Sequence, residues 1–584
     1  MICPKNLSFF LLLLTTNLFF GQNFLHRDNQ NIVDKNGNNI LLRGLGLGGW
    51  MVQEGYMLKT SDFAGPQFQI KQKISELIGD ENTEKFYKKY KENGITKRDI
   101  DSLAAWGFNS VRLPMHYNLY TLPIEKEPNS NENTWIEEGF VMTDSLLSWC
   151  ASNKIYLILD LHAAPGGQGK DANISDYDES KPSLWESKTN QEKMIAFWKK
   201  IATRYKDNEW IGGYDIINEP NWNFTGTNKN GCDETLNKPL RELQINITNA
   251  IREVDENHLI IIEGNCWGNN YKGIFPLWDE NMALSFHKYW SYNDLATIQQ
   301  MLDYRKEYNV PIWLGESGEN SNVWFQEVIS LIENNNIGWA FWPMKKIDNI
   351  AGITSVKETK DYQILLEYFK TGKNKPSVEF ATKTLLQIAE NYKMENLKIK
   401  YDVIDAMFRQ VQTNETKVFK KHSVENKIFA TEYDLGKLNY AYFDKDVANL
   451  WVSTGTDSKW NSGNKMRNDG VDIKECDDTV SNGFCVTSIE DGEWLQFTIN
   501  SSYDKVYDII VRYSNQKEGG KFYLTNENGE KISTDFILPF SNGNKKWKSA
   551  KLKKIKLNKG LNKVRIFFEK GNLDLNYLEF KPSK

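Results

Sequence analysis

The chain has 584 residues, more than one compact domain normally holds, and 40% of them are hydrophobic, so two domains with substantial cores are expected. Its formal net charge is only −5, which excludes the basic footprint of a nucleic-acid-binding protein and a polybasic membrane patch. Aromatic residues make up 13% of the chain, and this excess suits sugar binding, because the C–H faces of sugars stack on flat rings.

Residues 1–21 have the features of an export signal. Lys5 supplies a positive charge, and the uncharged, mostly apolar run from Leu7 to Phe20 is too short for a comfortable membrane span. The small residue Gly21 stands just before the expected cut. We therefore expect a secreted protein, extracellular, periplasmic or at the cell surface, with no stable membrane span after cleavage; an uncleaved anchor is the alternative.

Export permits disulfide bonds, and two cysteine pairs are candidates. Cys232 and Cys266 lie in two turn-rich segments, and Cys476 and Cys485 are close enough in sequence to close a loop. Cys150 lies in a helical pattern and is expected to be a core thiol. No cysteine spacing is typical of a zinc site.

Short apolar, β-rich runs alternate with helical patterns over residues 39–345. The helical patterns include 75–93, 191–204, 243–254 and 321–334, and the eight expected strands are 39–49, 107–115, 154–163, 211–220, 258–264, 282–289, 310–318 and 336–345. Continuous apolar strands separated by helices indicate a parallel sheet covered on both faces. Eight such units within about 300 residues predict a (β/α)8 TIM barrel.

Polar and aromatic residues cluster where the predicted strands end: Arg112, His162, Asn218, Glu219, His287, Tyr289, Glu316 and Trp342. In a parallel barrel all these ends open onto one face, where active sites are built. Each residue alone has an ordinary structural explanation, such as a cap, a rim salt bridge or packing. The convergence of polar and aromatic side chains from six strand ends is much harder to explain as ordinary solvent-exposed surface.

Beyond residue 343 the pattern becomes helical (361–369, 378–392 and 401–412), so the first domain is expected to span residues 22–412. A Lys-, Asn- and Thr-rich stretch, residues 413–427, predicts a linker. From 428 to 584, alternating strands such as 494–499, 506–513, 521–524 and 563–568 predict an all-β sandwich or jelly roll.

Glu219 and Glu316 form the chemical centre of the hypothesis. Cleavage of a glycosidic bond with retention needs a carboxylic acid to protonate the leaving oxygen and a carboxylate, roughly 5 Å away, to attack the anomeric carbon. We assign Glu219 as the acid/base and Glu316 as the nucleophile. Arg112 and Tyr289 are expected to keep Glu316 ionised and oriented.

The remaining predicted residues would bind substrate. Asn218 is expected to bond a sugar 2-hydroxyl, and His162 and His287 to position hydroxyls or tune Glu219. Trp342 is expected to stack beneath the sugar in the cleavage subsite.

Residues 39–345 resemble glycoside hydrolase family 5, the cellulase family of retaining (β/α)8 enzymes. Its eight functional positions, Arg, His, Asn-Glu, His, Tyr, Glu and Trp, are matched in order by the eight residues above. RGLGLGGW at 43–50, LHAAPGGQ at 161–168 and FHKY at 286–289 resemble the β-1,3-glucanase branches of that family, whereas GWAFWPMKK at 338–346 is more general among glucan hydrolases.

The resemblance implies a retaining β-glycoside hydrolase whose substrate is a polysaccharide or oligosaccharide, with a β-1,3-, β-1,4- or mixed-linkage β-glucan favoured and no cofactor for catalysis. Linkage, endo or exo action, and transglycosylation stay open. The alternatives are a hydrolase of another β-linked polymer, such as mannan or xylan, and a catalytically inactive carbohydrate-binding protein.

Residues 428–581 resemble a family 6 carbohydrate-binding module, through ATEYD at 430–434, RNDGVDI at 467–473, DGEWL at 491–495 and LNY at 575–577. The likeness implies that Trp547 stacks on a sugar, that Asn576 hydrogen-bonds it, and that a structural calcium is often present in such modules. Met466 and Ser488 replace aromatic residues that the family often has there, so a purely structural module is the alternative.

Overall fold

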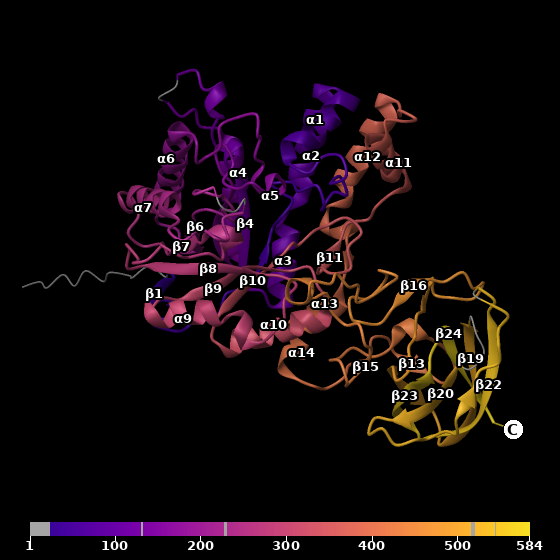
Figure 1. Cartoon of the computed structure of the whole chain (residues 1–584). Coiled ribbons are helices and arrows are strands. Elements are labelled where there is room, and N and C mark those ends of the chain that lie inside the picture. The colour runs from indigo at the N-terminus through magenta and orange to yellow at the C-terminus, as the bar shows by residue number, and fades with distance from the viewer. Residues whose placement is uncertain (1–23, 130–131, 227–229, 516–519, 544, 584) are drawn as a thin grey trace, which may run out of the picture.

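The computed structural model describes residues 24–129, 132–226, 230–515, 520–543 and 545–583. Figure 1 shows a large helix-rich part, coloured indigo to orange, and a smaller β-rich part in orange and yellow. The predicted export signal lies outside the described residues. Within the described ranges, no helix has the length and apolar character needed to cross a membrane.

Eight parallel strands close into a barrel in the order β10-β3-β4-β5-β6-β7-β8-β9. They are β3 (Arg43–Gly46), β4 (Ser110–His116), β5 (Tyr156–Ala163), β6 (Ile211–Asp215), β7 (Ile260–Glu263), β8 (Met282–Lys288), β9 (Ile312–Gly318) and β10 (Gly338–Trp342). The predicted TIM barrel is therefore confirmed. A small hairpin, β1 (His26–Asp28) and β2 (Asn31–Val33), precedes it.

Helices cover the barrel and extend it on one side (Figure 1). They are α1 (Gln67–Ile78), α2 (Asp80–Gly94), α3 (Lys97–Trp106), α4 (Glu137–Ser152), α5 (Ala172–Ser175), α6 (Lys188–Tyr205), α7 (Lys238–Arg252), α8 (Asn265–Gly268), α9 (Gln299–Glu307), α10 (Asn322–Asn334), α11 (Lys360–Thr371), α12 (Val378–Asn391), α13 (Tyr401–Met407) and α14 (Arg409–Gln412).

The helix predicted over 75–93 is two helices. Gly79 separates α1 from α2 with φ 79° and ψ 161°, a conformation that glycine adopts readily and that ends the helical hydrogen bonding. Helices α1 and α2 share an apolar cluster with α11 and α12, so the helical extension predicted after the barrel packs against its N-terminal helices. A two-stranded sheet, β11 (Thr354–Ser355) with β12 (Lys398–Ile399), braces this extension.

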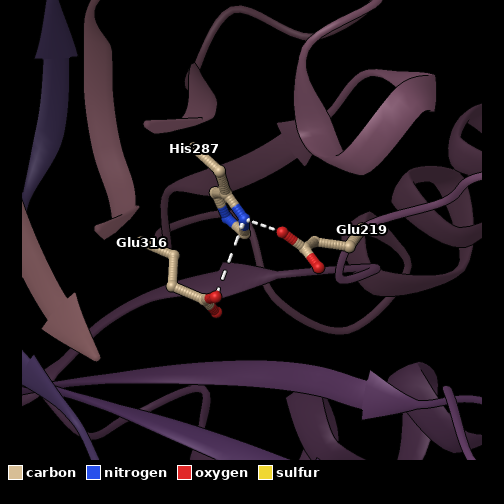
Figure 2. Close-up of side chains that lie close together, drawn as sticks. All are labelled: Glu219, His287 and Glu316. Carbon is tan, nitrogen blue, oxygen red and sulfur yellow. Dashed lines mark hydrogen bonds and ion pairs between the residues drawn. The ribbon is translucent and has the colours of Figure 1, made fainter. Parts of the chain in front are cut away.

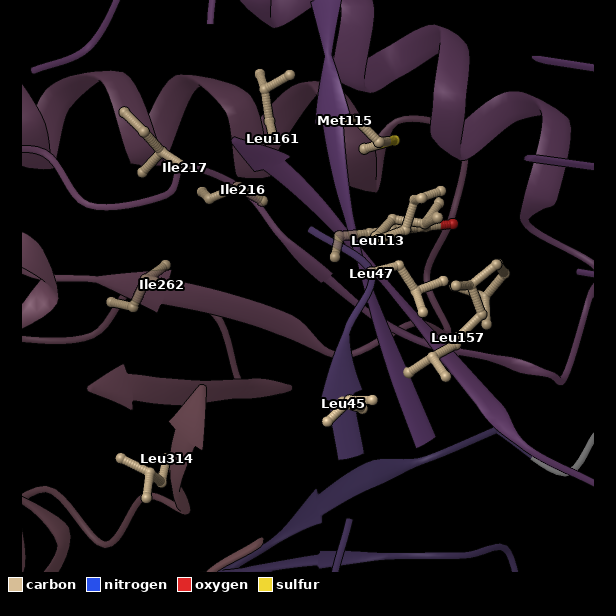
Figure 3. Packing of buried hydrophobic residues seen from close by; sticks show 14 of the residues in the cluster. Leu45, Leu47, Leu113, Met115, Leu157, Leu161, Ile216, Ile217, Ile262 and Leu314 are labelled. Atoms are coloured by element: carbon tan, nitrogen blue, oxygen red, sulfur yellow. The ribbon is translucent and has the colours of Figure 1, made fainter. Parts of the chain in front are cut away.

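Alternation along the strands separates the core from the site, as β5 shows. Leu157, Leu159 and Leu161 belong to the large apolar cluster between the sheet and its helices, part of which Figure 3 shows. The intervening residues face the barrel interior: Ile158 belongs to an apolar cluster near one end, and Asp160 and His162 belong to a polar network at the other. Period-2 alternation thus carries polar side chains to the carboxyl end of an otherwise apolar strand.

Two six-stranded sheets form the C-terminal module, around a separate apolar core. The first sheet contains β13 (His422–Ser423), β15 (Tyr442–Phe443), β18 (Trp494–Ser501), β20 (Lys521–Asn526), β21 (Phe536–Ile537) and β23 (Gly560–Lys570). The second contains β14 (Lys427–Phe429), β16 (Ile473–Glu475), β17 (Phe484–Val486), β19 (Lys505–Asn515), β22 (Lys548–Leu557) and β24 (Leu573–Pro582). The predicted all-β sandwich is confirmed.

The linker predicted over 413–427 is wrong for part of that stretch. Strand β13 pairs in parallel with β18, and His422 and Val424 are 7% and 5% exposed. The polar composition suggested a free tether, but alternate side chains enter the core of the module. This stretch is therefore structurally part of the sandwich.

A set of buried amides joins the module to the barrel domain. The backbone N–H of Asn468 donates to Asp402 at 2.8 Å, and its side-chain amide donates to the carbonyl of Asn320 and to Asn322 Oδ1 at 2.9 and 3.1 Å. Trp460 Nε1 donates to Asn468 Oδ1 at 3.1 Å. Asn468 and Asn320 are both 0% exposed, so the two domains share a closed polar contact.

Candidate active site

A cleft of about 1160 Å³ opens at the carboxyl ends of the barrel strands. Six of the eight residues predicted from the sequence line it: His162, Glu219, His287, Tyr289, Glu316 and Trp342. Arg112 and Asn218 do not line it, because both are almost fully enclosed beneath the carboxylates. All eight nevertheless lie in one connected set of contacts.

Glu219 and Glu316 face each other with His287 between them (Figure 2). One ligand atom from each of the three side chains lies within 4.8 Å of the others. His287 Nδ1 is 2.6 Å from Glu219 Oε1 and 4.0 Å from Glu316 Oε1. The two carboxylates are therefore close enough to act on the same sugar carbon and its leaving oxygen.

The chain reaches Glu219 in an unusual backbone conformation. Its φ is 43°, in the left-handed region that a residue with a Cβ rarely adopts, and its N–H donates to Glu263 Oε2 at 2.7 Å. The preceding Asn218 donates its N–H to the carbonyl of Leu161 at 3.1 Å. These contacts fix the turn after β6 so that the Glu219 side chain enters the cleft.

Arg112 is the centre of a buried charge network. It lies 3.2 Å from Asp160, 2.7 Å from Asp215, 3.0 Å from Glu263 and 2.8 Å from Glu316, each distance joining a guanidinium nitrogen to a carboxylate oxygen. Burial opposes the charge, but these carboxylates raise the pKa of Arg112 well above its ordinary value. Arg112 is therefore a permanent cation beneath Glu316.

Both oxygens of Glu316 are held by donors. Arg112 Nη1 donates to Oε2 and the Tyr289 hydroxyl donates to Oε1, each at 2.8 Å. Hydrogen bonds to both oxygens fix the rotamer of the Glu316 carboxylate. This geometry is what a nucleophile requires, and it is the arrangement expected from the sequence for Arg112 and Tyr289.

Glu219 has the opposite electrostatic setting. Burial raises the pKa of Glu219 to about 7, and the nearby charge of Glu316 acts in the same direction, whereas His287 opposes it. The pKa of His287 is raised well above its usual value because the carboxylates of Glu263, Glu316 and Glu219 outweigh its burial. The 2.6 Å contact between Glu219 Oε1 and His287 Nδ1 couples the titration of the two groups.

His162 is a neutral packing and hydrogen-bonding group. Burial lowers the pKa of His162 to about 3, and its Nδ1 donates to Asp160 at 2.9 Å. The other nitrogen then accepts from Asn218 Nδ2 at 3.5 Å. Its ring stacks on Trp342, with centroids 5.1 Å apart and planes 8° from parallel. The expected bond from Asn218 to a sugar hydroxyl stays a prediction.

Trp342 forms part of the floor of the cleft, and two glycines make room for it. A Cβ on Gly46 or Gly48 would lie 2.6 or 2.5 Å from the Trp342 ring, closer than any side chain tolerates. Trp342 Nε1 donates to the Tyr56 hydroxyl at 2.8 Å. Two glycines of the run at 43–50 therefore leave the space that the Trp342 indole ring occupies.

Several residues of the site were missed from the sequence. Asp160, Asp215 and Glu263 lie in strands that are otherwise apolar, and this contrast is a signal that could have found them. Glu54 lines the cleft with 6% exposure, and burial together with Glu316 and Glu219 raises its pKa well above the usual range. No local pattern marks Glu54, because it follows β3 in an irregular segment.

Of the two candidate disulfides, one is present. Cys232 and Cys266 are bonded, and Cys266 lines the cleft next to Trp267. Cys476, which follows β16, and Cys485, in β17, are free thiols, so the second candidate disulfide is not formed. Cys150 is a buried thiol as expected.

Metal binding has little support in the described residues. Glu219, His287 and Glu316 form the one group of three or more acidic, His or Cys side chains spaced for an ion there, and two of them, Glu219 and His287, are already in hydrogen-bond contact at 2.6 Å. Within the described part of the module no such group occurs, so its predicted calcium stays a prediction without assigned ligands.

The two module residues predicted to bind sugar differ in exposure. Trp547 is partly exposed, and its Nε1 donates to Asp477 at 2.8 Å. Asn576 is 0% exposed and donates to Asp478 and to the carbonyl of Val480 at 2.9 and 2.8 Å. The Asn576 amide therefore holds the segment that contains Asp478 and Val480, and its predicted sugar contact stays a prediction.

Comparison with known proteins agrees with this geometry. Residues 67–347 match the model of Cellulase (glycosyl hydrolase family 5), and residues 467–580 match Carbohydrate binding module (family 35). A carbohydrate-binding module was predicted, but its assignment to family 6 is not confirmed.

Similar proteins include two curated relatives. The chain is 27% identical over 385 residues to a Beta-xylosidase from Phanerodontia chrysosporium, covering 60% of this chain and 76% of the relative. It is 24% identical over 325 residues to Endoglucanase C from Acetivibrio thermocellus, covering 45% and 88%.

Among solved structures, Thermotoga maritima Cel5A in complex with mannotriose has 19% identity and a TM-score of 0.37, covering 52% of this chain and 90% of that one. Residues 67–347 form a glycosyl hydrolase family 5 domain, and the protein is a β-glycoside hydrolase with a C-terminal carbohydrate-binding module.

Proposed function

We propose that the protein is a secreted, retaining hydrolase that cleaves a β-glucan by double displacement. The observation that carries retention is the close approach of Glu219 and Glu316, whose nearest oxygens lie within 4.8 Å. Retaining enzymes hold their carboxyl groups about 5–5.5 Å apart, whereas inverting enzymes need about 6.5–9.5 Å to admit a water.

In the first step Glu219, protonated through its raised pKa of about 7, donates its proton to the leaving oxygen. A carboxylate oxygen of Glu316 attacks the anomeric carbon as the glycosidic bond breaks, forming a covalent glycosyl-enzyme. In the second step the Glu219 carboxylate removes a proton from water. The resulting oxygen bonds to the anomeric carbon and releases Glu316. Both steps use only side chains and water, so no cofactor is required.

The glucan assignment rests on the likeness of the segments at 43–50, 161–168 and 286–289 to β-1,3-glucanases, and on relatives named endoglucanases. A β-xyloside is the second candidate substrate. The Beta-xylosidase match covers 60% of this chain and the endoglucanase match 45%, so it extends over more of the molecule.

Secretion is supported by the signal-like residues 1–21 and by the Cys232–Cys266 bond, which forms in oxidising compartments. In this proposal the C-terminal module holds the enzyme on insoluble polysaccharide.

The test is release of reducing sugar from β-1,3-glucan, β-1,6-glucan, a cellulose derivative, mixed-linkage glucan, mannan and xylan. Activity on a glucan supports the proposal, and activity on xylan alone transfers it to the second candidate. Proton NMR of the first product gives the stereochemistry: a β-anomer supports retention, and an α-anomer contradicts it.

Glu316→Gln removes the nucleophile without changing the shape of the side chain. We expect turnover to fall by at least about 10⁴-fold with the thermal unfolding midpoint nearly unchanged. Glu256→Gln, at an exposed position outside the cleft, is the matched control and should keep full activity. Near-normal turnover by Glu316→Gln would overturn the assignment of the nucleophile.

A further inference from the structure

A loop of the C-terminal module forms one wall of the active-site cleft. Five of its residues line the same cleft as the catalytic carboxylates: Trp451, Val452, Ser453, Trp460 and Asn464. They lie between β15 and β16 of the sandwich, and α15 (Trp451–Thr454) is the one helical turn of this loop. The cleft is therefore built from both domains, although the barrel alone carries the catalytic residues.

Hydrogen bonds to the barrel domain fix the start of this loop. Asn449 N–H donates to Asn320 Oδ1 at 3.0 Å, and Asn320 Nδ2 donates to the carbonyl of Asn449 at 2.7 Å. Ala448 and Leu450 pack against the apolar cluster of the barrel. The reciprocal amide pair leaves little freedom to the residues that follow it.

The next residues are tied to the segment that follows β8. Val452 N–H donates to the carbonyl of Trp290 at 3.0 Å, and Tyr292 N–H donates to Ser453 Oγ at 2.9 Å. Trp460 is held by its bond to the buried Asn468, which is described above. The loop is thus anchored on both sides of Trp451 by partners in the barrel or at the domain contact.

Trp451 itself is 45% exposed, although its backbone is fixed. Its ring lies 5.8 Å from that of Trp290 with planes 34° apart, and Trp290 lies 5.0 Å from Tyr289 with planes 36° apart. The Tyr289 hydroxyl bonds the nucleophile Glu316 at 2.8 Å. A row of three aromatic rings therefore runs from the catalytic centre outward and ends on the module.

We propose that Trp451, together with Trp290, forms a sugar-binding subsite for a pyranose unit beyond the one held at the catalytic carboxylates. An anchored, half-exposed indole lining a cleft offers an apolar face to the C–H groups of a sugar ring, and it loses little conformational entropy on binding. The module then takes part in selecting the length of the substrate. This inference rests on the proposed glycosidase function and deepens it.

The test measures binding separately from hydrolysis. Calorimetric titrations use full-length Glu316→Gln, with and without Trp451→Ala, against glucose oligosaccharides of increasing length with β-1,3 or β-1,4 linkage, and against xylo-oligosaccharides. We expect Trp451→Ala to weaken binding of the longest oligosaccharides about tenfold and to leave the shortest bound ligand unaffected. Trp451→Phe should retain most of the affinity.

Tyr503→Ala is the matched control, because Tyr503 is an exposed aromatic residue of the module, at 71%, that does not line the cleft. Equal affinities with and without Trp451→Ala at every length would overturn the inference, as would an equal loss at every length or the absence of binding to Glu316→Gln. If the unaltered protein hydrolyses no polysaccharide, the proposed function fails, and the titrations still decide the role of Trp451.

Discussion

In the described part of each domain one arginine is completely buried, and the two arginines have different surroundings. Arg112 in the barrel faces four carboxylates, one of which, Glu316, opens into the cleft. Arg467 in the module faces Asp469 at 2.6 Å, backbone carbonyls and the ring of Tyr433 at 3.5 Å.

The difference lies in where each network ends. The contacts of Arg112 lead through Glu316 into the cleft, so this network is available for chemistry. The contacts of Arg467 are closed among buried groups, so they specify how strands and loops of the sandwich fit together. A buried charged side chain therefore indicates a functional site when one of its hydrogen-bond partners lines a cleft.

The largest expected effect separates the two arginines directly. Arg112→Lys keeps the charge but removes the planar fork, so Glu316 loses its orientation and kcat should fall by about a hundredfold or more. Arg467→Lys should keep kcat within about twofold while lowering the free energy of unfolding by about 1–3 kcal/mol. Steady-state kinetics and urea unfolding of both variants test the pair. A comparable loss of kcat in both would remove the distinction.

The next effect concerns pH. Glu219 must be protonated to act as an acid, and its pKa is raised to about 7 by burial, so kcat/KM should fall about tenfold per pH unit above that value. The proton is present at lower pH and is lost as the pH rises through about 7.

For Glu219→Gln we expect a much lower kcat/KM for substrates with poor leaving groups and no basic limb of the profile near pH 7. A profile of this variant that keeps that limb would assign the proton to another group. His162 should contribute nothing in this range, because its pKa is lowered to about 3.

The smallest of the three effects concerns the contact between the two domains. Asn468→Ala removes the side-chain amide that accepts from Trp460 Nε1 and donates to the carbonyl of Asn320 and to Asn322 Oδ1, so these buried groups lose a partner and the free energy of unfolding should fall by about 2–4 kcal/mol. If the amides couple the domains, calorimetry should show one unfolding transition for the unaltered protein and two for the variant. A single unshifted transition would mean that other contacts hold the module.

The sequence was sufficient for the barrel and for the first layer of the site, for a physical reason. Parallel strands end on one face, so the residues at their carboxyl ends, such as His162 and Glu316, must converge once the strands are recognised. The carboxylates around Arg112 could have been predicted in the same way, since Asp160 and Glu263 interrupt apolar strands.

The contact between the two domains could not be predicted from the sequence. Nothing around Trp451 indicates a partner, because its contact with Trp290 depends on how two separately folded cores meet. The linker prediction failed for the same reason. A polar composition indicates only that a segment can be exposed to solvent, whereas the pairing of β13 with β18 is set by the tertiary structure.

The absence of a slack tether at residues 413–427 has a consequence for how the enzyme searches a solid surface. A module on a flexible chain can bind anywhere within a radius and raises the local concentration of substrate over a wide area. A module seated on the rim of the cleft gives up that reach. Under the proposed function, it would present each captured polysaccharide chain at a fixed angle to the catalytic groups, so adsorption and alignment would be the same event.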